Sequence, residues 1–165
     1  MDPAAESGAG GHDALLVRPK CLFIALISGW AVAIFLPSAL IAILGLSPLA
    51  EGRSFPAATL AVADEVAPLA KIGFMLLLAP AMIAARRYLR VRRAIAAAYA
   101  LLAVAAMLAT LALIPAEYSR GFGIGLGGAR FSPGPLAIYL VGAVAAGLTA
   151  ALAEARCIAR NHPRP

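Results

Sequence analysis

Ionisable residues are nearly absent from the apolar parts of this sequence. The chain of 165 residues has eight Asp and Glu residues and two histidines, and none of them falls within its four long apolar runs. Carriers coupled to protons or sodium normally keep such groups inside the bilayer, so the sequence gives little support to that class. Haem held between helices needs paired histidines, whereas His12 and His162 both lie in the terminal segments.

Residues arranged for catalysis are missing as well. An aspartyl membrane peptidase needs a pair of aspartates near the outer surface, and Asp64 is the only aspartate expected there. Metal-dependent lipid-headgroup transferases need an aspartate cluster at the cytoplasmic face, and the sequence has none in that position. We therefore predict that the protein is not an enzyme and that it has no cofactor and no metal site.

Cysteine is rare and not arranged in a motif. Cys21 and Cys157 lie near opposite ends of the chain, with no CxxC partner and no histidine at ligand spacing. Both fall at predicted cytoplasmic helix ends, where thiols stay reduced. We expect two small, half-buried thiols, with palmitoylation or redox sensing as the alternative.

Apolar residues, in contrast, are abundant. They make up 62% of the chain, whereas a soluble domain usually has about 45–50%. The excess indicates lipid contact and an all-α polytopic membrane protein. The net charge of +6 is confined to segments that flank the apolar runs, which is typical of membrane orientation. We therefore expect the lipid bilayer as a partner and no nucleic acid.

Four transmembrane helices are predicted, because a spanning helix needs about 20 residues. Their approximate ranges are 21–46, 66–85, 94–116 and 135–153. The first ends before Ser47-Pro48, a stop signal, and the fourth starts at Pro135, a favourable residue for a first turn. The apolar run of the second is short, so we start it at Val66, which takes in Lys71. We expect the Lys71 side chain to extend to the outer surface and to pair with Asp64, Glu65 or lipid headgroups.

These spans define the expected domain organisation. We predict a disordered cytoplasmic leader at 1–20, a four-helix transmembrane domain at 21–156 and a short cytoplasmic tail at 157–165. The outer loop after the first span is apolar from Phe55 to Val62, and we expect a short interfacial helix there.

An arginine-rich segment between the second and third spans decides the orientation. At a bilayer centre each arginine costs about 2.5–3.5 kcal/mol, so this segment must lie in water or among headgroups. Five arginines occupy it: Arg86, Arg87, Arg90, Arg92 and Arg93. With both termini inside, ten of the 14 Lys and Arg residues lie on the cytoplasmic side. We therefore predict a multi-pass protein of a bacterial inner membrane with cytoplasmic termini. The arginine segment is expected to set this orientation, and the alternative is that it also binds anionic lipid or an acidic cytoplasmic partner.

The two halves of the chain resemble each other weakly. The second span opens with Pro68-Leu69-Ala70 and the fourth with Pro135-Leu136-Ala137. Two tandem helical hairpins, related by an axis along the membrane normal, would explain the likeness. Chance matches are common in alanine-rich sequence, and the alternative is no duplication.

Small residues recur at every fourth position in two spans, which places them on one helix face and allows close helix packing. The predicted packing residues are Ala25, Gly29 and Ala33 in the first span and Ala143, Gly147 and Ala151 in the fourth. We expect a non-enzymatic accessory or assembly subunit that packs through these faces, within a larger membrane complex or a homo-oligomer. The alternative is a small oligomeric transporter or channel for a small solute, with Lys71 as its candidate polar site.

Overall fold

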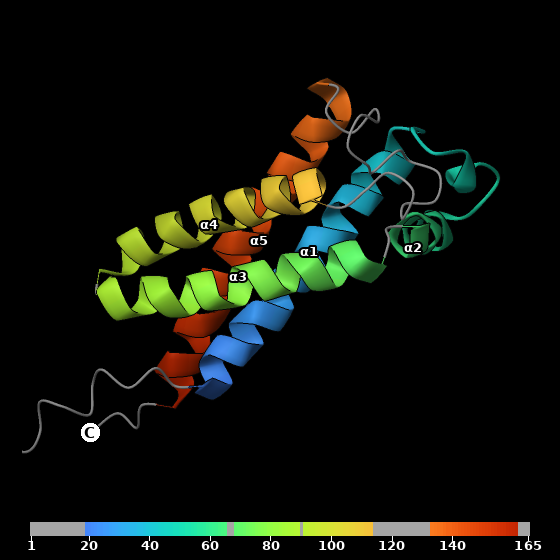
Figure 1. Cartoon of the computed structure of the whole chain (residues 1–165). Helices are drawn as coiled ribbons and strands as arrows, with labels where there is room; N and C mark the ends of the chain where they lie inside the picture. The colour runs from blue at the N-terminus through green and yellow to red at the C-terminus, as the bar shows by residue number, and fades with distance from the viewer. Residues whose placement is uncertain (1–18, 66–67, 90, 114–132, 162–165) are drawn as a thin grey trace, which may run out of the picture.

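Four apolar helices, each long enough to cross a membrane, make up most of the described chain. The computed structural model describes residues 19–65, 68–89, 91–113 and 133–161, and these contain helices but no strand. The long helices are α1 (Pro19–Ile43), α3 (Pro68–Tyr88), α4 (Arg92–Leu113) and α5 (Pro133–Arg160) (Figure 1). Between α1 and α3 lie a short 3₁₀ helix, η2 (Pro48–Ala50), and α2 (Phe55–Glu65). The predicted all-α class with four transmembrane helices is confirmed.

The end of α1 differs from the predicted one. Helix α1 stops at Ile43 rather than near Leu46, because Gly45 adopts the left-handed conformation with φ 62°. The amide of Gly45 then donates to the carbonyl of Ala42, and the amide of Leu46 donates to that of Ile41. This is a Schellman cap, which glycine forms at low steric cost. Ser47 instead begins η2, where its hydroxyl accepts a bond from the amide of Leu49.

The last helix is much longer than predicted. Helix α5 runs from Pro133 to Arg160, beyond the expected range of 135–153 at both ends. Pro133 is its first residue, so Pro135 lies third in the same first turn, and its last two turns contain Glu154 and Cys157. The helix continues because Glu154 has bonding partners inside the bundle, described below. The predicted end of the third span, at 116, lies outside the described residues.

The helices pack in a closed order in which each long helix packs against at least two others. Helices α1 and α5 form the most extensive pair, α4 packs on α5, α3 packs on α4, and α3 also contacts α1. Figure 1 shows the α3–α4 hairpin crossing the α1–α5 pair. Helix α2, whose existence the sequence predicted, packs against α1. The suggested duplication of two tandem hairpins stays a prediction.

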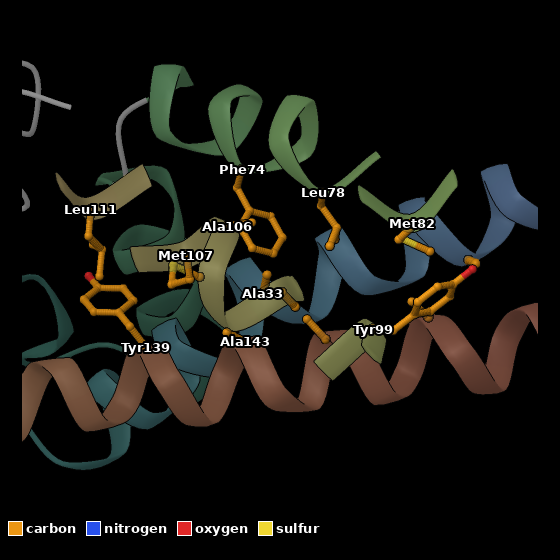
Figure 2. Close-up of a cluster of buried hydrophobic side chains, with 14 of the residues drawn as sticks. Ala33, Phe74, Leu78, Met82, Tyr99, Ala106, Met107, Leu111, Tyr139 and Ala143 are labelled. Carbon is orange, nitrogen blue, oxygen red and sulfur yellow. The ribbon is translucent and has the colours of Figure 1, made fainter. Parts of the chain in front are cut away.

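The interior of the bundle is filled mostly from α3 and α4. Phe74, Leu78 and Met82 lie four residues apart, so they share the buried face of α3. They point toward α5 in Figure 2, and Tyr99 and Met107 of α4 lie in the same buried cluster. The small residues of α5 instead face α1 and α4, the helices on which α5 packs most extensively.

The predicted small-residue faces are used within the chain itself. Gly29 of α1 faces α5 so closely that an added Cβ would lie 3.0 Å from the carbonyl oxygen of Ala146. Gly147 faces α4, where an added Cβ would meet the backbone of Tyr99 and Ala100. The other four predicted packing residues are also covered, with Ala25, Ala33 and Ala143 buried and Ala151 half-buried.

Helix α5 also has a second small-residue face that the sequence analysis did not identify. Gly142, Ala146 and Ala150 are buried and lie four residues apart on the side that faces α1. Gly142 lies against the ring of Pro37, and an added Cβ would overlap that ring. A proline within α1 is thus accommodated by a glycine on its neighbour.

Candidate functional site at the arginine-rich end

The arginine-rich segment is mostly helical rather than a loop. Helix α3 continues through Arg86 and Arg87 to Tyr88, and α4 begins at Arg92. Cations are favourable in the last turn of a helix, which accounts for the extension of α3 beyond the predicted end at residue 85. Arg90 lies outside the described residues. The segment therefore brings Arg86 and Arg92 to facing helix ends.

Glu154 is the one carboxylate buried within the described part of the bundle. It is 5% exposed, although the sequence analysis placed it beyond the last span. Its Oε1 accepts a hydrogen bond from Arg86 Nε at 2.7 Å, and its Oε2 accepts one from the Tyr99 hydroxyl at 2.9 Å. We call these three residues the Glu154 cluster. It joins α3, α4 and α5 at one end of the bundle.

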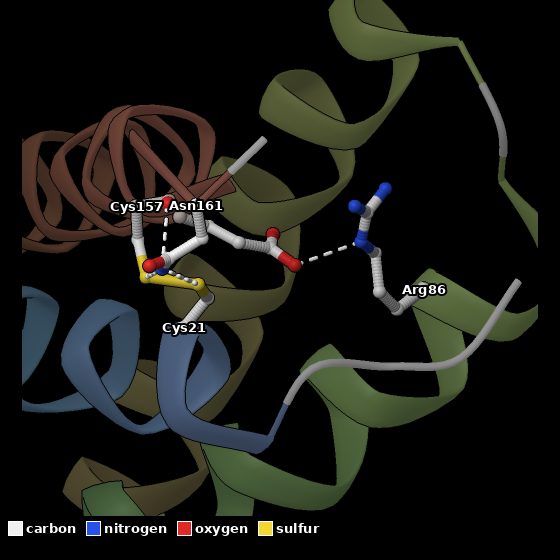
Figure 3. Close-up of a disulfide and its surroundings, with 5 residues drawn as sticks. Cys21, Arg86, Cys157 and Asn161 are labelled. Atoms are coloured by element: carbon white, nitrogen blue, oxygen red, sulfur yellow. Dashed lines mark hydrogen bonds and ion pairs between the residues drawn. A yellow bond between two sulfur atoms is a disulfide. The ribbon is translucent and has the colours of Figure 1, made fainter. Parts of the chain in front are cut away.

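The cluster is stable because each charge has a partner. An unpaired carboxylate in an apolar interior would cost several kcal/mol, by order of magnitude. Here both oxygens of Glu154 are bonded, and the Arg86 guanidinium neutralises its charge. The Nε atom of Arg86 makes the bond, and Figure 3 shows its terminal nitrogens directed away from the carboxylate. Those nitrogens remain available to a second anion.

A groove of about 450 Å³ opens beside the cluster. Its charged lining residues are Arg86, Arg92 and Glu154, and side chains of α4 and α5 form its apolar walls. The large apolar residues of the walls are Ile95, Leu148, Leu152 and Ile158. The groove therefore combines two cations and one carboxylate with hydrocarbon-like walls.

A disulfide lies at the same end of the molecule (Figure 3). It joins Cys21, near the start of α1, to Cys157 in the last turns of α5, with Cα atoms 5.4 Å apart. The expectation of two separate, reduced thiols is therefore wrong for this structure. The two cysteines meet because antiparallel packing places the first turn of α1 beside the last turns of α5. Asn161 closes the helix end by donating from Nδ2 to the Cys157 carbonyl at 3.0 Å.

Lys71, the predicted polar site, lies near the other end of the bundle. It is half-buried and lines a cavity of about 40 Å³, which has room for roughly one to three water molecules. Ser38 and Thr110 line the same cavity, and each hydroxyl donates to a carbonyl of its own helix. The carbonyl of Lys71 accepts a hydrogen bond from the indole of Trp30 at 2.9 Å, which links α1 to α3.

The predicted ion pair of Lys71 with Asp64 or Glu65 is not found. Among the residues that the structure describes, the only ion pair is between Arg86 and Glu154. One oxygen of the Glu65 carboxylate, Oε2, is buried and has no partner within that part of the chain. Burial raises the pKa of Glu65 above its ordinary value. Within the same residues, no group of three or more His, Cys, Asp and Glu side chains could hold a metal ion.

The arginines of the site could be predicted from the sequence, whereas Glu154 and Tyr99 were not among the predicted site residues. One signal was available, since the repeat of Ala143, Gly147 and Ala151 continues at Ala155. A helix that keeps its packing face beyond a charged residue must place that residue in or beside the bundle. The pairing of Glu154 with Arg86, 68 positions earlier, depends on tertiary structure and has no local signal.

Comparison with known proteins gives no relative for this chain. No protein family model, no curated protein and no solved structure matches it.

Proposed function

We propose that this chain is a non-enzymatic multi-pass membrane protein that acts as an accessory or assembly subunit and contacts its partner through α3. The observation that carries the proposal is the uneven covering of the helices. In the apolar stretch of α3, 22% of the residues are buried, against 39% in each of the other long helices. A helix so little covered by its own chain offers the largest free surface for another membrane protein.

The small-residue faces support the same choice of surface. The sequence suggested that they meet a partner, but α1, α4 and α5 use them against one another. A partner would therefore have to bind elsewhere. Leu69, Ile72 and Leu76 are 55%, 54% and 68% exposed and lie along one side of α3. Apolar side chains of this kind can pack against another transmembrane helix as well as against lipid.

Photo-crosslinking inside the native membrane tests this proposal. A photoreactive amino acid replaces Leu76 on α3 in one variant and Leu101 on α4 in the control, which is 71% exposed. We expect a discrete protein adduct from position 76 and none from position 101, with the adduct identified after mild-detergent purification. Equal adducts at both positions, or none at either, would contradict the proposal.

A small transporter or channel, with Lys71 on its path, is the second candidate. The cavity at Lys71 supports it only weakly, because the cavity is small and the hydroxyls of Ser38 and Thr110 are bonded to their own helices. Vesicles containing the purified chain should show no solute flux that depends on Lys71. Flux that disappears in Lys71→Ala would favour the transporter instead.

The proposal also includes an orientation and a membrane. The excess of cationic residues at the arginine-rich end favours the cytoplasm for that end and for both termini. The alanine- and arginine-rich composition is typical of bacterial genes of high GC content and suggests a bacterial inner membrane.

A further inference from the structure

The groove beside the Glu154 cluster is lined by charged residues and by apolar residues, a combination that suits an amphipathic ligand. We infer that it is a binding site for a single anionic phospholipid, with the phosphate at Arg86 and Arg92 and an acyl chain along α5. This inference depends on the membrane location of the bundle. It does not depend on any partner protein, so it stands apart from the proposed subunit role.

The charged residues of the groove suit a phosphate group. Arg86 contributes terminal nitrogens that its bond to Glu154 leaves unused, and Arg92 contributes an exposed guanidinium. A guanidinium group matches the geometry of a phosphate and can donate two parallel hydrogen bonds to two of its oxygens. Arg92 and Ile95 also place the first turn of α4 at the groove. A helix N-terminus adds favourable partial charge for an anion.

The Glu154 cluster holds Arg86 in position before a phosphate binds. Without Glu154, Arg86 would be a flexible chain whose ordering costs conformational entropy. The bond from Nε to Oε1 holds the guanidinium in one position, and the Tyr99 hydroxyl holds the carboxylate from the other side. Both oxygens of Glu154 already accept hydrogen bonds and Arg86 balances its charge, so Arg92 supplies the net positive charge of the groove.

The rest of the groove suits an acyl chain and not a free phosphate. Leu148 and Leu152 are 43% and 52% exposed, and they form one wall with Ile158. The other lining residues have small side chains, which leave room for an acyl chain: Ala96, Ala151, Ala155 and Ala159. A volume of about 450 Å³ lies within the usual range for small-molecule sites. A phosphate alone would leave this apolar surface empty.

The site differs from general attraction between an arginine-rich segment and an anionic surface. Arg87 and Arg93 are exposed neighbours that do not line the groove. Diffuse attraction would treat all the arginines alike, whereas the groove distinguishes Arg92 from Arg87 and Arg93. These two residues are therefore matched controls of equal charge.

The test uses the purified full-length chain in a neutral detergent. Its thermal stability is measured during titration with dioctanoyl phosphatidylglycerol, with dioctanoyl phosphatidylcholine and with inorganic phosphate. We expect saturable stabilisation by phosphatidylglycerol alone. Arg92→Gln should weaken its apparent affinity about fivefold, the equivalent of ~1 kcal/mol for one cation near a lipid surface. Arg87→Gln and Arg93→Gln should leave the affinity unchanged.

A second pair of variants tests the apolar part of the groove without changing charge. Ala155→Trp fills the groove and should abolish the stabilisation. Ala97→Trp, at an exposed position of α4 outside the groove, should not. Equal losses from all three Arg variants, equal effects of phosphate and phosphatidylglycerol, or normal binding by Ala155→Trp would each overturn the inference. None of these outcomes would bear on the crosslinking test of α3.

Discussion

The Tyr99 hydroxyl is the part of the Glu154 cluster that can be removed with the least disturbance. Tyr99 is fully buried, and Tyr99→Phe deletes only the donor to Glu154 Oε2. We expect this change to lower the free energy of unfolding by about 1–2 kcal/mol, a typical value for a hydrogen bond to a charged group or between membrane helices. Unfolding in a graded mixture of mild detergent and SDS measures it.

Glu154→Gln tests what the charge of Glu154 adds to this bond, since it keeps the size of the side chain and removes its charge. Tyr99→Phe should cost less stability in a Glu154→Gln background than in the natural chain, because a hydrogen bond to a neutral group is weaker. Equal costs in the two backgrounds would mean that the charge of Glu154 adds nothing to the Tyr99 bond.

The carboxyl group of Glu65 gives the protein a predictable dependence on pH. Burial raises its pKa in the folded state above the ordinary 4.5, so the folded protein holds this proton more tightly than the unfolded chain. Its contribution to stability therefore declines as pH rises from about the ordinary value through the raised one. Glu65→Gln should remove this decline, measured as melting temperature between pH 4 and 8.

The neighbouring acid provides the control for Glu65→Gln. Asp64 is exposed, and Asp64→Asn removes the same formal charge from the end of α2. If Asp64→Asn changed the pH profile as much as Glu65→Gln does, net charge rather than burial would be its cause.

At the scale of the helix, Gly147 is the position that tolerates a side chain least. An added Cβ there would meet the backbone of Tyr99 and Ala100, which cannot move without moving α4. Gly147→Ala should destabilise the bundle by about 1–3 kcal/mol, the usual cost of overpacking. Gly134→Ala, where an added Cβ would meet nothing within 4 Å, should be neutral or slightly stabilising. Melting of both variants in detergent makes the comparison.

The existence of the helices could be predicted from the sequence, but their ends could not. Long apolar runs alone account for the four spanning helices. The ends depended on local details, such as the left-handed Gly45, and on tertiary partners, such as Arg86 for Glu154. A charged residue marks the edge of a span only when its charge has no partner inside the bundle.

The candidate site could be predicted only in part, for the same reason. The arginine composition indicated an anionic ligand, but the groove requires α3, α4 and α5 together. The small-residue repeat indicated close packing, yet it does not specify whether the neighbour belongs to the same chain. Periodicity describes one face of a helix and contains no information about which helix covers it.

At the scale of the whole molecule, orientation and disulfide chemistry are linked. The proposed cytoplasmic end carries both cysteines, and the cytoplasm keeps most thiols reduced. The structure joins Cys21 to Cys157, whereas a cytoplasmic position predicts that growing cells keep both thiols reduced. A maleimide added as growing cells are lysed would then label both thiols, and the purified chain would form the intramolecular bond on mild oxidation. Faster migration on a non-reducing gel, absent in Cys21→Ser, reports the bond.

The opposite result would be equally informative about topology. If the bond is already complete in growing cells, the arginine-rich end faces an oxidising compartment and the proposed orientation is wrong. Reporter fusions at residues 58 and 89 give an independent answer. A cytoplasmic signal is expected at residue 89 and a periplasmic one at residue 58.

The close contact between Pro37 and Gly142 limits how α5 can move along α1. A slide of α5 by one turn, about 5.4 Å, would bring Ile138 or Ala146 against the proline ring in place of Gly142. The same slide would bring Ala143 or Ala151 against the α4 backbone, where only the hydrogen of Gly147 fits. The packing of α5 on α1 and its packing on α4 would thus both be disrupted by the same slide. Sliding of α5 by one turn is therefore opposed from two sides, by Pro37 of α1 and by the α4 backbone.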